Sequence, residues 1–99
     1  QHANSQATAL AKQITAFDQL KLVWPVHSNE LFVIMPKGLA DHLKTAGAEF
    51  YDWYVGTLPP NITLGELEMF VRLVTSFVTQ DAQRRDFCEL ISDYFANQP

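Results

Sequence analysis

The sequence predicts an α+β fold, a small two-layer sandwich in which a mostly antiparallel sheet of about four strands is backed by helices. Three segments carry apolar residues at helical spacing. Four others are short apolar runs rich in β-branched and aromatic residues, which is typical of strands. The order of these segments is α-β-β-α-β-β-α. With 99 residues and no linker, repeat or low-complexity segment, the chain is expected to form one domain over residues 1–99.

The chain begins with a predicted helix followed by a hairpin. Residues 4–18 form the helix, because their apolar positions recur every three or four residues. The run "LKLVWPV", residues 20–26, is a short strand, and Pro25 places it at an edge because proline donates no ladder hydrogen bond. The run "ELFVIM", residues 30–35, is apolar on both faces and is expected to be covered on both. The apolar stripe of the helix consists of Ala7, Leu10, Ala11, Ile14 and Phe17.

A second helix and two further strands follow. The helix is expected over residues 37–46, with Gly47 ending it as a C-terminal cap. The run "AEFYDWYV", residues 48–55, is the third strand. Residues 56–67 form a loop, because two consecutive prolines forbid regular pairing. Residues 68–76 are the fourth strand. The inward positions of the second helix are Leu39, Ala40 and Leu43.

The last helix is predicted from its capping residue and its apolar stripe. Thr79 caps the first turn, and Asp81 within that turn is favoured by the helix dipole. Arg85 is spaced to pair with Asp81 and with Glu89 on the exposed side, four residues away in each direction. The stripe that faces the sheet consists of Phe87, Leu90, Ile91, Tyr94 and Phe95.

Composition and charge exclude several classes of function. Eleven acidic residues outnumber seven basic ones, and apart from the pair Arg84-Arg85 the basic residues are scattered. A nucleic-acid or anionic membrane surface is therefore not expected. The chain has no apolar run of eighteen residues and no signal-peptide pattern at its start, and its one cysteine fits a reducing compartment. These features predict a cytoplasmic protein.

No metal site or catalytic residue is predicted. The histidines lie far from one another and from Cys88, and none has the spacing of a zinc site. Cys88 shares a helical stripe with apolar residues and is expected to pack rather than react. No lysine stands out as a desolvated nucleophile. For four aromatic residues, packing in a core or interface is favoured over lining a pocket: Trp24, Tyr51, Trp53 and Tyr54. The histidines are His2, His27 and His42.

Arg72 is a permanent cation inside the apolar run "EMFVRLVTSF", residues 68–77. Strand alternation places it on one face with Phe70. A charge in such a run needs an anion. One reading is an internal ion pair with Glu30 or Glu68, and the other is a guanidinium that binds a ligand carboxylate through a bidentate fork. Periodicity alone leaves both open.

Three stretches of the chain resemble a known family. They are "HANSQATALAKQI", "WPVHSNELFVIMPKGLADHLKTAGAEFYDW" and "VRLVTSFVTQDAQRRDFCELI". Together they resemble the C-terminal small domain of low-specificity L-threonine aldolases, which are pyridoxal-phosphate enzymes of the aspartate-aminotransferase-like fold and the β-eliminating lyase group. The resemblance covers nearly the whole chain in the right order. Its most specific part is "A-G-x-x-F-Y-D-W" followed by "V-R-L-V-T-S".

The resemblance implies a function and a division of labour. The family cleaves β-hydroxy-α-amino acids by a retro-aldol reaction to glycine and an aldehyde, as homo-oligomers, and the arginine equivalent to Arg72 binds the substrate carboxylate. The imine lysine and the residues that hold pyridoxal phosphate belong to a large N-terminal domain, which we expect to be absent from this sequence. This chain is therefore expected to bind no cofactor and to be inactive alone. Its expected partners are that large domain or further copies of itself. The loop over residues 54–67 is longer than is usual in the family.

A reading from another class is a stand-alone binding or assembly module from a truncated gene. Such a module keeps the fold and self-associates through apolar surface that once met the missing part. Trp24, Trp53 and the Phe-rich strands are the expected contributors. Whether a large domain is encoded in the same reading frame distinguishes the two readings.

Overall fold

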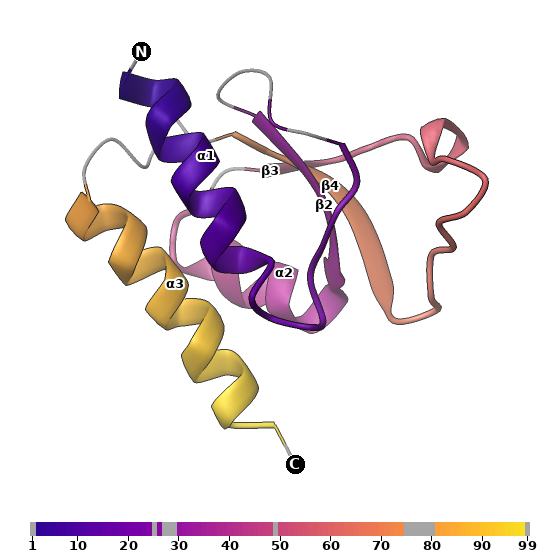
Figure 1. Cartoon of the computed structure of the whole chain (residues 1–99). Helices are drawn as coiled ribbons and strands as arrows, with labels where there is room; N and C mark the ends of the chain where they lie inside the picture. The colour runs from indigo at the N-terminus through magenta and orange to yellow at the C-terminus, as the bar shows by residue number, and fades with distance from the viewer. Residues whose placement is uncertain (1, 25, 27–29, 49, 75–80, 99) are drawn as a thin grey trace.

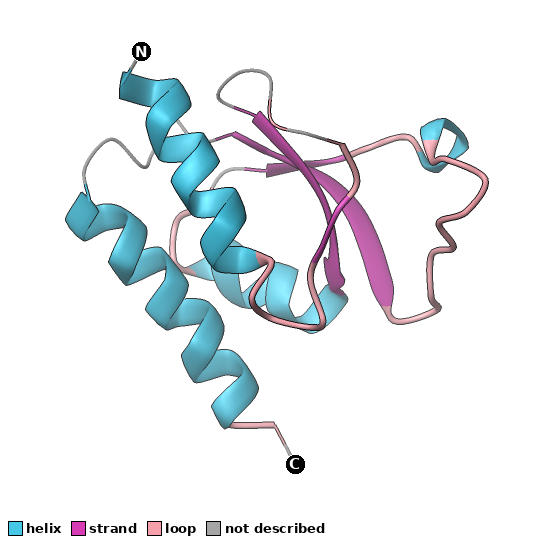
Figure 2. Cartoon of the chain, viewed as in Figure 1, coloured by secondary structure: helices cyan, strands magenta, loops and turns pink. Residues whose placement is uncertain are grey.

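The computed structural model describes residues 2–24, 26, 30–48, 50–74 and 81–98. Within these ranges the chain forms a four-stranded antiparallel sheet and three α-helices, so the predicted α+β class is confirmed (Figure 2). The elements are α1 (His2–Ile14), β1 (Lys21–Leu22), β2 (Glu30–Pro36), α2 (Lys37–Thr45), β3 (Phe50–Asp52), the 3₁₀ helix η1 (Val55–Thr57), β4 (Glu68–Val74) and α3 (Asp81–Ala96).

The sheet has the strand order β1-β2-β4-β3, with each neighbouring pair antiparallel. The two central strands pair over seven residues each, from Glu30 opposite Val74 to Pro36 opposite Glu68. The two outer strands are only two and three residues long, so the predicted strands over 20–26 and 48–55 were too long. An outer strand has a pairing partner on one side only, and its length depends on where that partner ends rather than on its own apolar run. Pro25, predicted to mark the edge, lies outside the described residues.

All three α-helices contribute to one core against one face of the sheet, as Figure 1 shows. The central strands send alternate residues to this helix-covered face, and all of them except the partly buried Met69 are at most 1% exposed. Burying a side chain of this size contributes about 1.5–3 kcal/mol to folding. These residues also confirm the predicted alternation of β4. The helix-covered face consists of Leu31, Val33, Met35, Met69, Val71 and Leu73 together with Phe50 of β3.

The end of α2 has the predicted glycine cap. Gly47 has a φ of 102°, a left-handed conformation that costs glycine little. Its N–H donates to the carbonyl oxygen of Lys44 at 3.0 Å, and the N–H of Ala48 donates to that of Leu43 at 3.0 Å. This pair of hydrogen bonds is the Schellman motif, which satisfies the last carbonyls of a helix. The motif turns the chain directly into β3.

Helix α3 is held to both other helices. The Arg84 Nε donates to Gln13 Oε1 of α1 at 2.6 Å, and its NH1 lies 2.9 Å from Asp81 Oδ1. Asp81 thus pairs with Arg84, three residues along the helix, whereas the sequence suggested a pair with Arg85, four residues along it. On the α2 side, Gly38 lies so close to Tyr94 that a β-carbon at Gly38 would overlap the phenol oxygen. Thr79, the predicted cap, lies outside the described residues.

The long loop between β3 and β4 projects away from the body of the domain (Figure 1). Apart from η1, its described residues form no regular structure. Tyr54 is 75% exposed and Leu67 is 79% exposed, so neither side chain belongs to the core. Within the described ranges no helix is both long and apolar enough to cross a membrane.

Candidate functional site

The second face of the sheet carries aromatic side chains instead of α-helices. Although no described α-helix covers it, Ile34 is fully buried and Phe70 is 2% exposed. Trp24 covers part of this face, with its ring centroid 5.7 Å from that of Phe70 and 5.0 Å from that of Phe32, both edge-on. We call this the aromatic face; it consists of Trp24, Phe32, Ile34, Tyr51, Trp53, Phe70 and Arg72.

Arg72 lies in the middle of the aromatic face, as strand alternation predicted. In the register of the sheet it is directly opposite Phe32 of β2 on one side and Tyr51 of β3 on the other. Its guanidinium carbon is 5.2 Å from the ring centroid of Tyr51 and 5.2 Å from that of Trp53. The Trp53 ring is held in turn by an edge contact to Phe32, with centroids 5.2 Å apart. Cation–π contacts of this kind contribute about 0.5–1 kcal/mol each and restrain the guanidinium plane.

Among the described residues, Arg72 pairs with Glu30, one of the two carboxylates that the sequence suggested. The distance from Arg72 NH1 to Glu30 Oε2 is 3.5 Å, and the two side chains are 30% and 34% exposed. A close charge-assisted hydrogen bond is about 2.7–2.9 Å long, so this pair is loose and partly hydrated. The other suggested acid, Glu68, accepts a hydrogen bond from the Gly65 N–H at 2.8 Å and closes the loop before β4.

The guanidinium of Arg72 is therefore incompletely satisfied. Its Nε atom is buried and has no hydrogen-bond partner among the described residues. Its NH1 lies 3.5 Å from the Glu30 carboxylate, which is longer than a good hydrogen bond. A restrained, partly exposed guanidinium with spare donors is suited to binding a carboxylate. The structure thus contains the predicted internal ion pair with Glu30, and that pair is loose enough to leave the guanidinium available for a ligand carboxylate.

A cleft of about 330 Å³ lies beside this site, between the long loop and the sheet. Trp53 lines the cleft and also contacts Arg72, so the two are adjacent. Its walls combine apolar side chains with three carboxylates and one lysine. No sequence pattern predicts this cleft, because the loop that closes it has no periodicity. The lining residues are Lys37, Asp52, Trp53, Val55, Leu64, Gly65, Glu66, Glu68, Met69 and Phe70.

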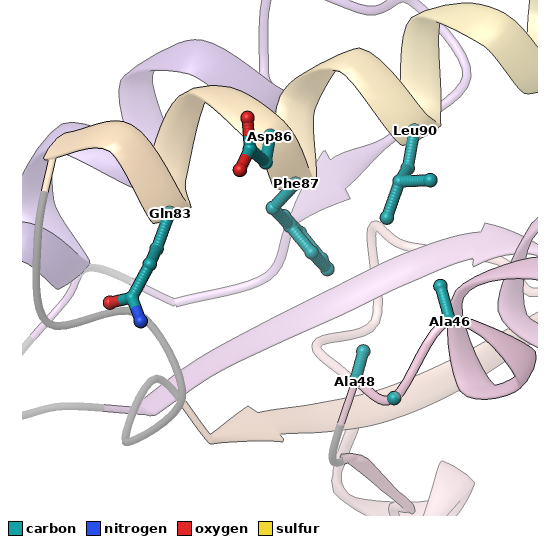
Figure 3. Close-up of a pocket in the computed structure, with 7 residues that line it drawn as sticks. Ala46, Ala48, Gln83, Asp86, Phe87 and Leu90 are labelled. Carbon is teal, nitrogen blue, oxygen red and sulfur yellow. The ribbon is translucent and has the colours of Figure 1, made fainter.

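Another hollow, of about 270 Å³, lies between α3 and the turn after α2 (Figure 3). Asp86 and Gln83 are at its rim, and Phe87 and Leu90 point toward the turn from the same helix. Among the described residues of its lining, Asp86 is the one acidic side chain. The lining residues are Ala46, Gly47, Ala48, Gln83, Asp86, Phe87 and Leu90.

Cys88 and the histidines are the remaining candidates for chemistry. Cys88 is half-buried and packs against the core, and burial raises the pKa of its thiol above the usual value even though Arg84 acts in the opposite direction. The prediction that it packs is confirmed. Across the described ranges, no group of three or more His, Cys, Asp or Glu side chains is arranged to hold a metal. His27 lies outside those ranges.

The favoured interpretation of the four aromatic residues is correct only in part. Trp24 packs on its neighbours, as expected. Tyr51 is 50% exposed, and both it and Trp53 flank the arginine. Tyr54 is mostly exposed and does not pack in the core. The sequence could not reveal the flanking pair, because their position depends on the register between β3 and β4.

The sequence and the fold can be compared with those of known proteins. No family model matches the sequence, and no curated protein matches it either. Among solved structures, a threonine aldolase from Leishmania major is 25% identical and superposes with a TM-score of 0.70 over 94% of this chain. The chain has a threonine-aldolase-like fold. It spans about a quarter of that enzyme, 24% of its length.

The threonine-aldolase-like fold raises the question of whether this chain's residues fit pyridoxal phosphate, the cofactor that the sequence resemblance implies. A lysine that forms an imine is normally desolvated so that its amine is neutral and nucleophilic. Every lysine of the sequence is described, and every one is exposed. The residues of this chain therefore do not fit the role of cofactor anchor. The lysines are Lys12, Lys21, Lys37 and Lys44.

Proposed function

We propose that the chain is the C-terminal small domain of a threonine-aldolase-like lyase and that Arg72 binds the α-carboxylate of a β-hydroxy-α-amino acid. The observation that carries the proposal is a guanidinium restrained by Tyr51 and Trp53 whose pair with Glu30, at 3.5 Å, is longer than a good hydrogen bond. The threonine-aldolase-like fold supports the choice of reaction class.

In this proposal the chain positions a substrate and does not transform it. Cleavage to glycine and an aldehyde takes place on a large domain that supplies the imine lysine and holds pyridoxal phosphate. A carboxylate held at two points has one fixed orientation, which sets the direction of the bond to be cleaved. Tyr51 and Trp53 contribute by limiting the rotation of the guanidinium.

A titration followed by NMR tests carboxylate binding directly. The 99-residue chain, labelled with ¹⁵N in its arginine side chains, is titrated with L-threonine and separately with L-threoninol, which has an alcohol in place of the carboxylate. We expect the Arg72 signals to move with threonine and not with threoninol. The Arg84 side chain, engaged by Gln13 and Asp81, is an internal reference. An equal response to both compounds, or no response at Arg72, would contradict the proposal.

A second candidate function, self-association, is favoured by a different observation. The four most exposed large apolar side chains in the described ranges lie on β3 and in the loop between β3 and β4. Large exposed apolar patches favour association. Sedimentation at micromolar concentration, with Leu67→Ser as the matched variant, tests this function: dimers that dissociate in the variant support it. The four residues are Tyr51, Tyr54, Val55 and Leu67.

A further inference from the structure

The two bidentate edges of the Arg72 guanidinium are not equally accessible. A carboxylate binds a guanidinium either along the edge formed by Nε and one terminal nitrogen, or across the two terminal nitrogens. The first edge is closed to a ligand, because Nε is buried. The second edge remains, and Glu30 Oε2 lies 3.5 Å from NH1 on that edge.

A bidentate ligand and Glu30 therefore compete for the same donor. Glu30 is the first residue of β2 and its side chain is 34% exposed, so its carboxylate lies at the end of a strand and is partly hydrated. Exposed ion pairs contribute only about 0.2–1 kcal/mol, which makes the cost of releasing Glu30 small but measurable. Both geometry and energy thus permit exchange.

We propose that Glu30 is an internal carboxylate that occupies the Arg72 site in the absence of ligand, and that a ligand carboxylate binds by displacing it. The inference rests on the proposed function of Arg72. Glu30 keeps the cation paired while the site is empty and lowers the apparent affinity for every carboxylate, since only the fraction of molecules with a free terminal edge can bind. A ligand that forms both hydrogen bonds to the terminal edge offsets this cost more readily than an anion that forms one.

The test uses glycine as the probe, with ethanolamine as its analogue without a carboxylate. Dissociation constants are measured from the Arg72 side-chain signals of the wild-type chain, Glu30→Gln and Glu68→Gln. Glutamine in place of Glu30 keeps the size and removes the charge, so we expect glycine to bind about two- to sixfold more tightly. Glu68 is on β4 and faces the same side of the sheet as Arg72 and Glu30. Glu68→Gln therefore removes the same charge from the same side, and it keeps the acceptor for the Gly65 N–H. We expect a smaller change there, and no response to ethanolamine in any variant.

A further variant separates the effect of the charge at residue 30 from that of its side-chain length. Glu30→Asp keeps the carboxylate but shortens the side chain by one methylene, which draws it further from NH1. We expect a dissociation constant between those of the wild type and Glu30→Gln. Equal tightening in Glu30→Gln and Glu68→Gln would overturn the inference, because the effect would then be one of net charge. Weaker or unchanged binding in Glu30→Gln would also overturn it, while leaving the carboxylate-binding role of Arg72 intact. No glycine-dependent shift at Arg72 in any variant would overturn both.

Discussion

The side chains that β2 and β4 send to the helix-covered face are apolar and almost completely buried, whereas those on the aromatic face include a cation and a carboxylate that are about one-third exposed. Leu73 and Arg72 show the contrast within two consecutive residues of β4. Leu73 is fully buried among residues of the helices, and Arg72 lies between aromatic rings with its terminal nitrogens near solvent. The difference indicates that one face stabilises the fold and the other is free to carry a function.

The largest expected effect concerns chemistry. If the aromatic face binds a ligand without transforming it, incubation with pyridoxal phosphate and reduction with borohydride should leave no lysine stoichiometrically labelled, because every lysine is exposed. Intact-mass and peptide mass spectrometry measure the labelling. Low labelling spread over the four lysines is the expected background. Stoichiometric labelling of one lysine, with aldehyde released from threonine, would show that the chain is a complete enzyme.

The helix-covered face should be the most sensitive to truncation. Leu73→Ala removes a fully buried side chain and leaves a cavity, so we expect the free energy of unfolding to fall by about 2–5 kcal/mol. Urea denaturation followed by circular dichroism measures the change. Tyr51→Ala, on the opposite face and 50% exposed, is the control and should lose much less. Similar losses in both variants would remove the distinction between the faces.

The packing of α2 against α3 gives an intermediate effect. A methyl group at Gly38 would overlap the phenol oxygen of Tyr94. We expect Gly38→Ala to lower the free energy of unfolding by about 1–3 kcal/mol. The double variant with Tyr94→Phe, which removes the overlapping oxygen, should recover most of the loss. If Gly38→Ala instead stabilises the chain, through the higher helix propensity of alanine, the two helices are less tightly packed than the structure indicates.

A smaller effect is expected for the reactivity of the Cys88 thiol on α3. Burial raises the pKa of its thiol, so the folded state favours the neutral form. Its contribution to stability is complete below the thiol's unfolded pKa and is lost as pH rises through the higher folded pKa. We expect a disulfide reagent to label Cys88 more slowly in the native chain than in urea at pH 8. Equal rates in the two conditions would show that the thiol is not protected.

Most of the fold could be predicted from local patterns, but the site depended on pairing between distant strands. The helices and the central strands follow from apolar periodicity, and Gly47 follows from its position after α2. Glu30 reaches Arg72 because the register of β2 with β4 places it opposite Val74, whereas Glu68 lies on the same strand as Arg72, about 13 Å along it. Tyr51 and Trp53 reach the guanidinium because β3 pairs with β4 at that point. No local pattern contains that information.

The measurement that tests the central claim most directly is the stability of Arg72→Ala beside that of Leu73→Ala. If Arg72 is held for a ligand, its removal leaves a partly hydrated Glu30 and two ring faces without the guanidinium, and the free energy of unfolding should fall by about 1–2 kcal/mol, mainly from the two cation–π contacts. Urea denaturation of both variants under the same conditions gives the comparison. If Arg72 is instead part of a structural ion pair, Glu30 would be left unpaired. A loss of about 3–5 kcal/mol, comparable with that of Leu73→Ala, would then contradict the account.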